Sequence, residues 1–88
     1  MIASVPKGSE PSPGKFARAF SEQVRLSMAR NRVSGADLAR MTGRSQSYIS
    51  KRLRDESSFS ANDCEVICEF LNEDMLEFVT AAIRSIKK

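Results

Sequence analysis

One apolar spacing constrains the fold of this chain more than any other feature. Leu38 and Ala39 are followed four residues later by Gly43, and Ile49 follows six residues after the glycine. Ala39 is small enough for two helix backbones to cross closely, and Gly43 tolerates the positive φ of a tight turn. Ile49 can then pack from the second helix back onto the first. The spacing therefore predicts a helix-turn-helix.

Start signals and apolar stripes predict three further helices around this pair, and no strand. Ser34 and Ser60 each precede an acid by three residues, Asp37 and Asp63, in the pattern of a capping box, and Ser45 caps the second helix of the pair. Apolar residues recur at helical spacing elsewhere: Phe16, Phe20 and Val24; Cys64, Ile67, Cys68 and Leu71; Met75, Val79, Ala82 and Ile86. We expect an all-α, compact five-helix bundle, with helices over 16–29, 35–42, 45–54, a segment after Ser60, and 74–87.

The first fourteen residues differ from the rest in composition. Residues 1–14 hold all three prolines and two of the four glycines, so we expect a flexible, disordered N-terminal arm before one domain over 15–88. Lys7 is the arm's lone cation, which favours an inert tail over an arm that follows a DNA minor groove. The chain has no apolar run of about 20 residues and no signal-like start, which predicts a cytoplasmic protein without a membrane span.

The cysteine and histidine content argues against metal and enzyme chemistry. Cys64 and Cys68 lie one helical turn apart in a chain without histidine, so they cannot complete a four-ligand zinc site and are poorly placed for a disulfide. We expect them to be small buried side chains. The sequence also lacks a nucleophile–base pair and a phosphate-binding glycine loop. We therefore expect no enzyme, no metal and no cofactor.

Charge is segregated along the chain. Residues 15–54 carry ten Lys and Arg against two acids, a net charge of +8, whereas residues 55–88 carry eight acids against three cations, a net charge of −5. A dense basic segment favours a polyphosphate partner through counterion release. A solvated helix face is the alternative. Because the helix-turn-helix occupies the basic segment, we favour double-stranded DNA as the partner.

The helix over 45–54 has an apolar and a polar side. Ile49 and Leu53 form its inner face, Ser47 and Lys51 lie opposite, and Gln46 stands in the first turn. The residues that we expect to contact bases are these three polar residues with Tyr48 beside the outer face and Ser50 at its edge: Gln46, Ser47, Tyr48, Ser50 and Lys51. A Gln amide can bind adenine N6 and N7 together. Arginines in and beside the helix-turn-helix are assigned to DNA phosphates: Arg40, Arg44, Arg52 and Arg54. The alternatives are helix-start packing for Gln46 and a solvated cation for Lys51.

The segment 33–71 resembles the lambda-repressor-like helix-turn-helix domains, the Cro/cI-type or XRE family. The resemblance rests on Leu38-Ala39, Gly43, Gln46 to Ser50, Ile67 and Leu71, which stand where the family pattern places them. It implies that the helix over 45–54 reads bases, that the helix over 35–42 anchors to the DNA backbone, and that C-terminal elements form a dimer. The chain departs from the pattern at Gly35, often a phosphate-binding glutamine, and at Asp55, often a glycine.

These observations predict a sequence-specific transcriptional regulator, a small phage- or prophage-type repressor that occludes its operator. The fifth helix either closes the monomer core or forms a homodimer, for which the candidates are Leu76, Phe78, Val79 and Ile83. A two-fold dimer would need a palindromic operator with half-sites about 10 bp apart. The alternative function is an antitoxin-like or other protein-interaction module whose acidic half binds a basic partner.

Overall fold

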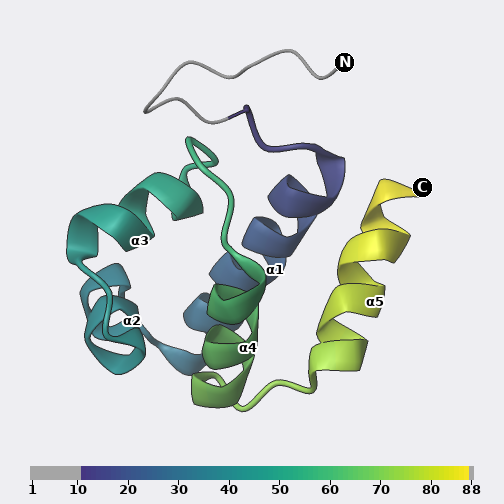
Figure 1. Cartoon of the computed structure of the whole chain (residues 1–88). Helices are drawn as coiled ribbons and strands as arrows, with labels where there is room; N and C mark the ends of the chain where they lie inside the picture. The colour runs from purple at the N-terminus through teal and green to yellow at the C-terminus, as the bar shows by residue number, and fades with distance from the viewer. Residues whose placement is uncertain (1–10, 88) are drawn as a thin grey trace.

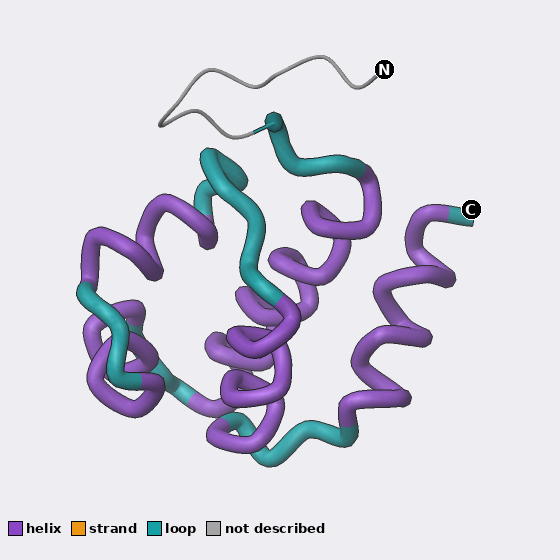
Figure 2. The backbone as a smooth tube through the Cα atoms, in the orientation of Figure 1, coloured by secondary structure: helices purple, strands orange, loops and turns teal. Residues whose placement is uncertain are grey.

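The computed structural model describes residues 11–87, and the helices in this part of the chain agree with the predicted all-α class (Figure 1). No strand occurs between residues 11 and 87, as the colouring of Figure 2 shows. Most of the predicted arm, residues 1–10, lies outside the described residues, and Pro13 in the irregular segment before the first helix is buried. None of the described helices is long and apolar enough to cross a membrane. Within residues 11–87 the helices are α1 (Lys15–Asn31), α2 (Gly35–Thr42), α3 (Gln46–Leu53), α4 (Ala61–Phe70) and α5 (Met75–Ile86).

Capping boxes form at the starts of α2 and α4, as the sequence predicts. The Ser34 hydroxyl accepts the Asp37 N–H at 3.0 Å, and the Asp37 carboxylate accepts the Ser34 N–H at 3.1 Å. Ser60 and Asp63 make the same exchange, with both distances at 3.0 Å. Each box satisfies backbone donors that the first helical turn leaves without a partner. Local sequence therefore fixes where these two helices begin.

The Asp37 box is sensitive to acid. The hydrogen bond from the Ser34 backbone, together with the Arg40 guanidinium, lowers the pKa of Asp37 from 3.8 to about 2. A carboxyl with a lowered pKa contributes its stabilisation fully above its unfolded value and loses it as the pH falls through the folded value. The α2 start is therefore intact at neutral pH and weakens only between about pH 4 and pH 2.

Helix α1 runs through the middle of the bundle and α5 lies beside it (Figure 1). The two helices are antiparallel, because Ser27 near the end of α1 contacts Glu73, just before α5, while Phe20 further back contacts Phe78. The rings of Phe20 and Phe78 meet edge to face, with centroids 5.2 Å apart. Such a pair adds to the free energy gained from burial alone. The fifth helix thus closes the monomer core.

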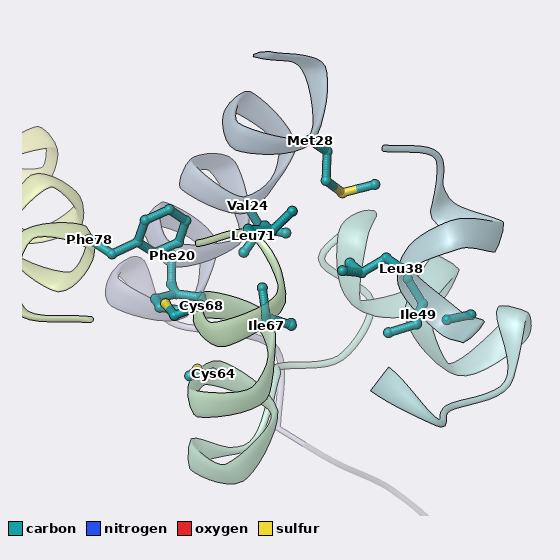
Figure 3. Close-up of a cluster of buried hydrophobic side chains, with 11 residues drawn as sticks. Phe20, Val24, Met28, Leu38, Ile49, Cys64, Ile67, Cys68, Leu71 and Phe78 are labelled. Carbon is teal, nitrogen blue, oxygen red and sulfur yellow. The ribbon is translucent and has the colours of Figure 1, made fainter. Parts of the chain in front are cut away.

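One continuous apolar core joins all five helices. Figure 3 shows Phe20 and Phe78 at one end of it and Leu38 and Ile49 at the other. The buried members are Phe20, Val24, Met28, Leu38, Ala39, Ile49, Cys64, Ile67, Cys68, Leu71 and Phe78. Both cysteines are free thiols, and burial raises the pKa of each to about 11, so they are protonated at neutral pH. The predicted role of the cysteines as small buried side chains is confirmed.

The helix-turn-helix forms as its apolar spacing predicts. Ala39 is 4% exposed where α2 and α3 meet, and Ile49 is 1% exposed beneath α3. Gly43 ends α2 with a φ of 71°, and no heavy atom outside its own chain neighbours lies within 4 Å of the position that a Cβ would take there. Backbone conformation, and not lack of space, therefore favours glycine at this turn.

Three other helix ends use the same left-handed geometry without glycine. Arg32, Asp55 and Asn72 follow α1, α3 and α4 with φ between 56° and 61°. At the first of these ends the N–H of Val33 reaches back to the Met28 carbonyl at 2.9 Å, which satisfies an otherwise unpaired acceptor. A side chain in this conformation carries a steric cost that glycine avoids.

Replacement of Arg32 by glycine should therefore stabilise the fold. The left-handed conformation costs an L-residue about 1–2 kcal/mol, and glycine loses about 0.5–1 kcal/mol through the greater freedom of its unfolded chain. We expect Arg32→Gly to raise the free energy of unfolding by about 0.5–1 kcal/mol, measured by urea denaturation. The control Arg18→Gly, at an exposed site inside α1, should lower it by about 1 kcal/mol. Equal effects at the two sites would contradict the role of φ.

Candidate nucleic-acid interface

Helix α3 lies at the edge of the bundle that is remote from α5 (Figure 1). Its apolar side, Ile49 and Leu53, packs on the core, so its opposite side faces solvent. Ser47 and Lys51 are exposed there, Gln46 is exposed at the first position of the helix, and Ser50 is half-buried at the margin. Three of the five residues predicted to contact bases are thus exposed, and Ser50 and Tyr48 are half-buried.

Helix α1 holds the C-terminal end of α3. The Ser21 hydroxyl donates to the Arg52 carbonyl at 3.0 Å, and Arg25 Nη1 donates to the Leu53 carbonyl at 2.6 Å. These bonds satisfy acceptors that the last helical turn leaves open, and the Arg25 charge suits the negative end of the α3 dipole. Sequence reasoning missed both anchoring residues, because their partners are backbone atoms about thirty positions away.

Helix α4 holds the N-terminal end of α3 through one carboxylate. Asp63 is 4% exposed. Its Oδ2 accepts the Tyr48 hydroxyl at 2.6 Å and the Ser60 N–H at 3.0 Å. Its Oδ1 accepts Arg44 Nε at 3.0 Å and lies 2.7 Å from Arg44 Nη2. A residue predicted only as a helix-start acid therefore also ties α3 and the preceding turn to α4.

The ring of Tyr48 contacts two guanidinium groups. The Arg52 Cζ lies 3.5 Å from the ring centroid and the Arg44 Cζ lies 4.9 Å from it. Arg52 Nη1 also donates to the Tyr48 carbonyl at 3.2 Å. Cations over an aromatic face are attracted by its quadrupole. Tyr48, predicted to contact bases, and Arg52, predicted to contact a phosphate, are thus half-buried partners within the protein.

The other two predicted phosphate ligands are more accessible. Arg40 pairs with Asp37 at 2.8 Å and Arg54 with Glu56 at 2.7 Å, and both arginine side chains are more than half exposed. Exposed ion pairs contribute only about 0–1 kcal/mol, so a phosphate can replace the carboxylate at little cost. Arg44 differs from them because its carboxylate partner is buried.

The Asp63 cluster shifts two pKa values in opposite directions. Burial alone would raise the pKa of Asp63, but hydrogen bonds from Tyr48, Ser60 and Arg44 outweigh it and hold the pKa below its usual value. The pKa of Tyr48 is raised, first by burial and then by its bond to the Asp63 carboxylate, although both arginines oppose the change. At neutral pH the cluster therefore consists of a carboxylate, a neutral phenol and two cations.

The candidate dimer residues on α5 fall into two groups. Phe78 is buried against Phe20 in the monomer, and Val79 is half-buried against the core, so the apolar stripe that includes them closes the bundle. Leu76 is 75% exposed and Ile83 is 40% exposed. A hollow of about 390 Å³ lies along the same outer side of the helix, lined by Leu76, Glu77, Thr80, Ala81 and Arg84.

The fold and the exposed side of α3 define a helix-turn-helix domain. The family model described as Helix-turn-helix matches residues 25–78, more than half of the chain. The chain therefore belongs to the lambda-repressor-like, XRE-type helix-turn-helix family of DNA-binding transcription regulators. The crystal structure of the clp gene regulator ClgR from C. glutamicum is similar, with a TM-score of 0.74 and 20% identity over 83% of this chain and 95% of that chain. That likeness shows the fold alone. No curated protein matches the sequence.

Tyr48 is the one tyrosine of the chain, so its ionisation can be followed in isolation. Because burial and Asp63 both disfavour the phenolate, we expect its absorbance change to have a midpoint above the usual value of about 10. Asp63→Asn should move that midpoint back toward 10, since it removes the neighbouring negative charge. Circular dichroism at each pH would show that the protein is still folded. A midpoint at or below 10 in the folded protein would contradict the contact.

Proposed function

We propose that the protein is a sequence-specific regulator of transcription, a small phage- or prophage-type repressor that occludes its operator. The observation that carries the proposal is that α3 packs on the core with one side and exposes polar residues on the other. Its apolar side packs on the core, while Ser47 and Lys51 are exposed on the other side and Gln46 is exposed at the first position of the helix. An α-helix presented in this way fits the DNA major groove, where base edges offer donors and acceptors.

Base contacts are assigned to the exposed polar residues of α3. Gln46 is the first residue of the helix, and its amide can bind the N6 and N7 atoms of one adenine. Ser47 and Ser50 can donate to or accept from any base, and Lys51 can reach guanine O6 and N7. Tyr48 has its hydroxyl on Asp63, which leaves only the ring available for an apolar contact with a thymine methyl.

Phosphate contacts are assigned to the arginines that flank this surface. Arg40 and Arg54 are accessible and only weakly paired within the protein. Arg44 stands just before α3 and keeps 36% of its side chain exposed. These contacts would fix the register of the protein on the duplex without reading sequence. Arg52 contributes its charge to the same surface, with its guanidinium stacked on Tyr48.

A homodimer through the outer side of α5 accounts for the apolar surface that the monomer leaves uncovered. Leu76 and Ile83 are exposed beside the hollow, and Glu77 and Arg84 border it around the small residues Thr80 and Ala81. In an antiparallel pair of α5 helices, Glu77 of each copy would approach Arg84 of the other. Such a dimer would use a palindromic operator with half-sites about 10 bp apart.

Replacement of Gln46 by alanine tests the base-reading role. Selection of bound sites from a random duplex pool should give a defined motif for the wild-type protein, and Gln46→Ala should relax it at one position, equivalent to about 1–3 kcal/mol of lost discrimination. The control Gln23→Ala makes the same chemical change on α1 and should leave the motif unchanged. Binding without any preferred site in the wild-type protein would count against sequence-specific regulation and favour the protein-interaction alternative.

Replacement of Leu76 by glutamate tests the dimer. A charge on this exposed position should convert a dimer into a monomer in analytical ultracentrifugation, with little change in the thermal midpoint. Loss of the linked second half-site should weaken binding to a palindromic duplex by about 10²-fold. Leu26→Glu, at an exposed leucine on α1, serves as the matched control and should not alter the mass. A wild-type protein that is monomeric both alone and on DNA would exclude this dimer.

A further inference from the structure

Asp63 is a buried acid that contacts Arg44 and Tyr48 of the helix-turn-helix, and its role as a helix cap does not require these contacts. The Ser60–Asp63 capping box needs one carboxylate oxygen, Oδ2, and one backbone N–H. In the same box at Ser34 and Asp37, the carboxylate pairs with Arg40 of its own helix. The bonds from Arg44 and Tyr48 to Asp63 are therefore additional to capping and call for a separate explanation.

Both carboxylate oxygens of Asp63 have partners. Oδ1 accepts a hydrogen bond from Arg44 Nε and lies 2.7 Å from Arg44 Nη2, and Oδ2 accepts hydrogen bonds from the Tyr48 hydroxyl and the Ser60 N–H. A buried carboxylate with three hydrogen bonds and an ion pair restricts the orientation of its partners, because rotation of one of them would leave a charged acceptor less satisfied.

The contact restricts the orientation of Arg44, whose side chain is still 36% exposed. It uses two of the three guanidinium nitrogens, Nε and Nη2, and leaves Nη1 for another acceptor. The backbone of Arg44 is fixed as well, since its N–H donates to the Ala39 carbonyl at 2.9 Å. The conformational entropy of this long side chain is therefore lost on folding and not on binding DNA.

Tyr48, on α3, contacts the same carboxylate and the same arginine. Its hydroxyl donates to Asp63, and the guanidinium groups of Arg44 and Arg52 lie over its ring, with each Cζ within 5 Å of the ring centroid. The Asp63 carboxylate therefore holds both Arg44 and a ring that Arg44 contacts.

We propose that Asp63 is a positioning residue for DNA binding: it holds Arg44 ready for a backbone phosphate and keeps the Tyr48 hydroxyl away from base edges. This inference rests on the proposed function. The competing explanation is that Asp63 merely neutralises a basic surface, in which case its removal would strengthen binding to DNA.

Two substitutions separate positioning from charge. Asp63→Asn removes the negative charge and places an amide against Arg44, whereas Arg44→Lys keeps the positive charge but replaces a planar group with a single nitrogen. A positioning role predicts that both variants bind a fluorescein-labelled mixed-sequence duplex roughly three- to tenfold more weakly. It also predicts that the slope of log K against log salt falls by about one unit, measured between about 50 and 200 mM salt.

The matched control for charge is Asp74→Asn. Asp74 caps α5 by accepting the Glu77 N–H at 2.9 Å, and asparagine is an equally good cap, so only the net charge changes. This variant should bind the duplex as well as the wild-type protein or slightly better, with an undiminished salt slope. The positioning role is overturned if Asp63→Asn behaves like Asp74→Asn, or if Arg44→Lys binds like the wild-type protein.

Two further measurements keep the test decisive. If circular dichroism shows that Asp63→Asn does not fold, Arg44→Lys decides the question, because it leaves Asp63 with Tyr48, Ser60 and a cation. Tyr48→Phe should leave the selected DNA motif unchanged, and a changed base preference would show that the hydroxyl reads DNA. Failure of the wild-type protein to bind any duplex would instead refute the proposed function itself.

Discussion

The fixed orientation of α3 is the constraint on which the exposed surface depends. A helix of eight residues is too short to be stable by itself, and its geometry has to come from tertiary contacts. Ile49 supplies the apolar contact beneath it, Arg25 and Ser21 close its C-terminal end, and Asp63 holds its N-terminal half. Loss of any of these contacts would allow the helix to tilt or fray. The exposed residues of α3 keep fixed positions relative to the rest of the protein because contacts with α1 and α4 hold both ends of the helix.

The fold could be predicted from the sequence where local chemistry decides the conformation. Both capping boxes and the glycine turn at Gly43 are short-range patterns, and each forms as expected. The left-handed ends at Arg32 and Asn72 could not be recognised, because their sequences lack the usual glycine and the conformation follows from how the chain must leave the helix. The apolar stripe of α5 was ambiguous for a different reason. Periodicity shows that a face is buried but not against what, and the partner of Phe78 proves to be Phe20 of the same chain.

The candidate site was only partly predictable, for the same physical reason. Helical spacing places Ser47 and Lys51 opposite Ile49 whatever the rest of the chain does, and both are exposed. Tyr48 lies between these two faces, and a third element decides its surroundings. The start of α4 brings Asp63 within 2.6 Å of its hydroxyl, fifteen residues along the chain. Nothing local distinguishes this acid from Asp37, which occupies the same place in its own capping box and stays near the surface.

The segregation of charge along the chain overstates how much positive charge is available to a polyanion. Several arginines of the basic segment have carboxylate partners within 4 Å: Arg25, Arg30, Arg40, Arg44 and Arg54. Counterion release depends on the number of phosphates actually neutralised, not on the net charge of a segment. The exposed pairs can exchange partners with DNA, whereas Arg25 and Arg44 are tied to backbone carbonyls or to a buried carboxylate. The sequence therefore locates the basic segment, but the three-dimensional pairing decides how each arginine can bind a phosphate. An arginine in an exposed ion pair can exchange its carboxylate for a phosphate. An arginine held by a buried carboxylate or a backbone carbonyl can bind a phosphate only while it keeps that partner.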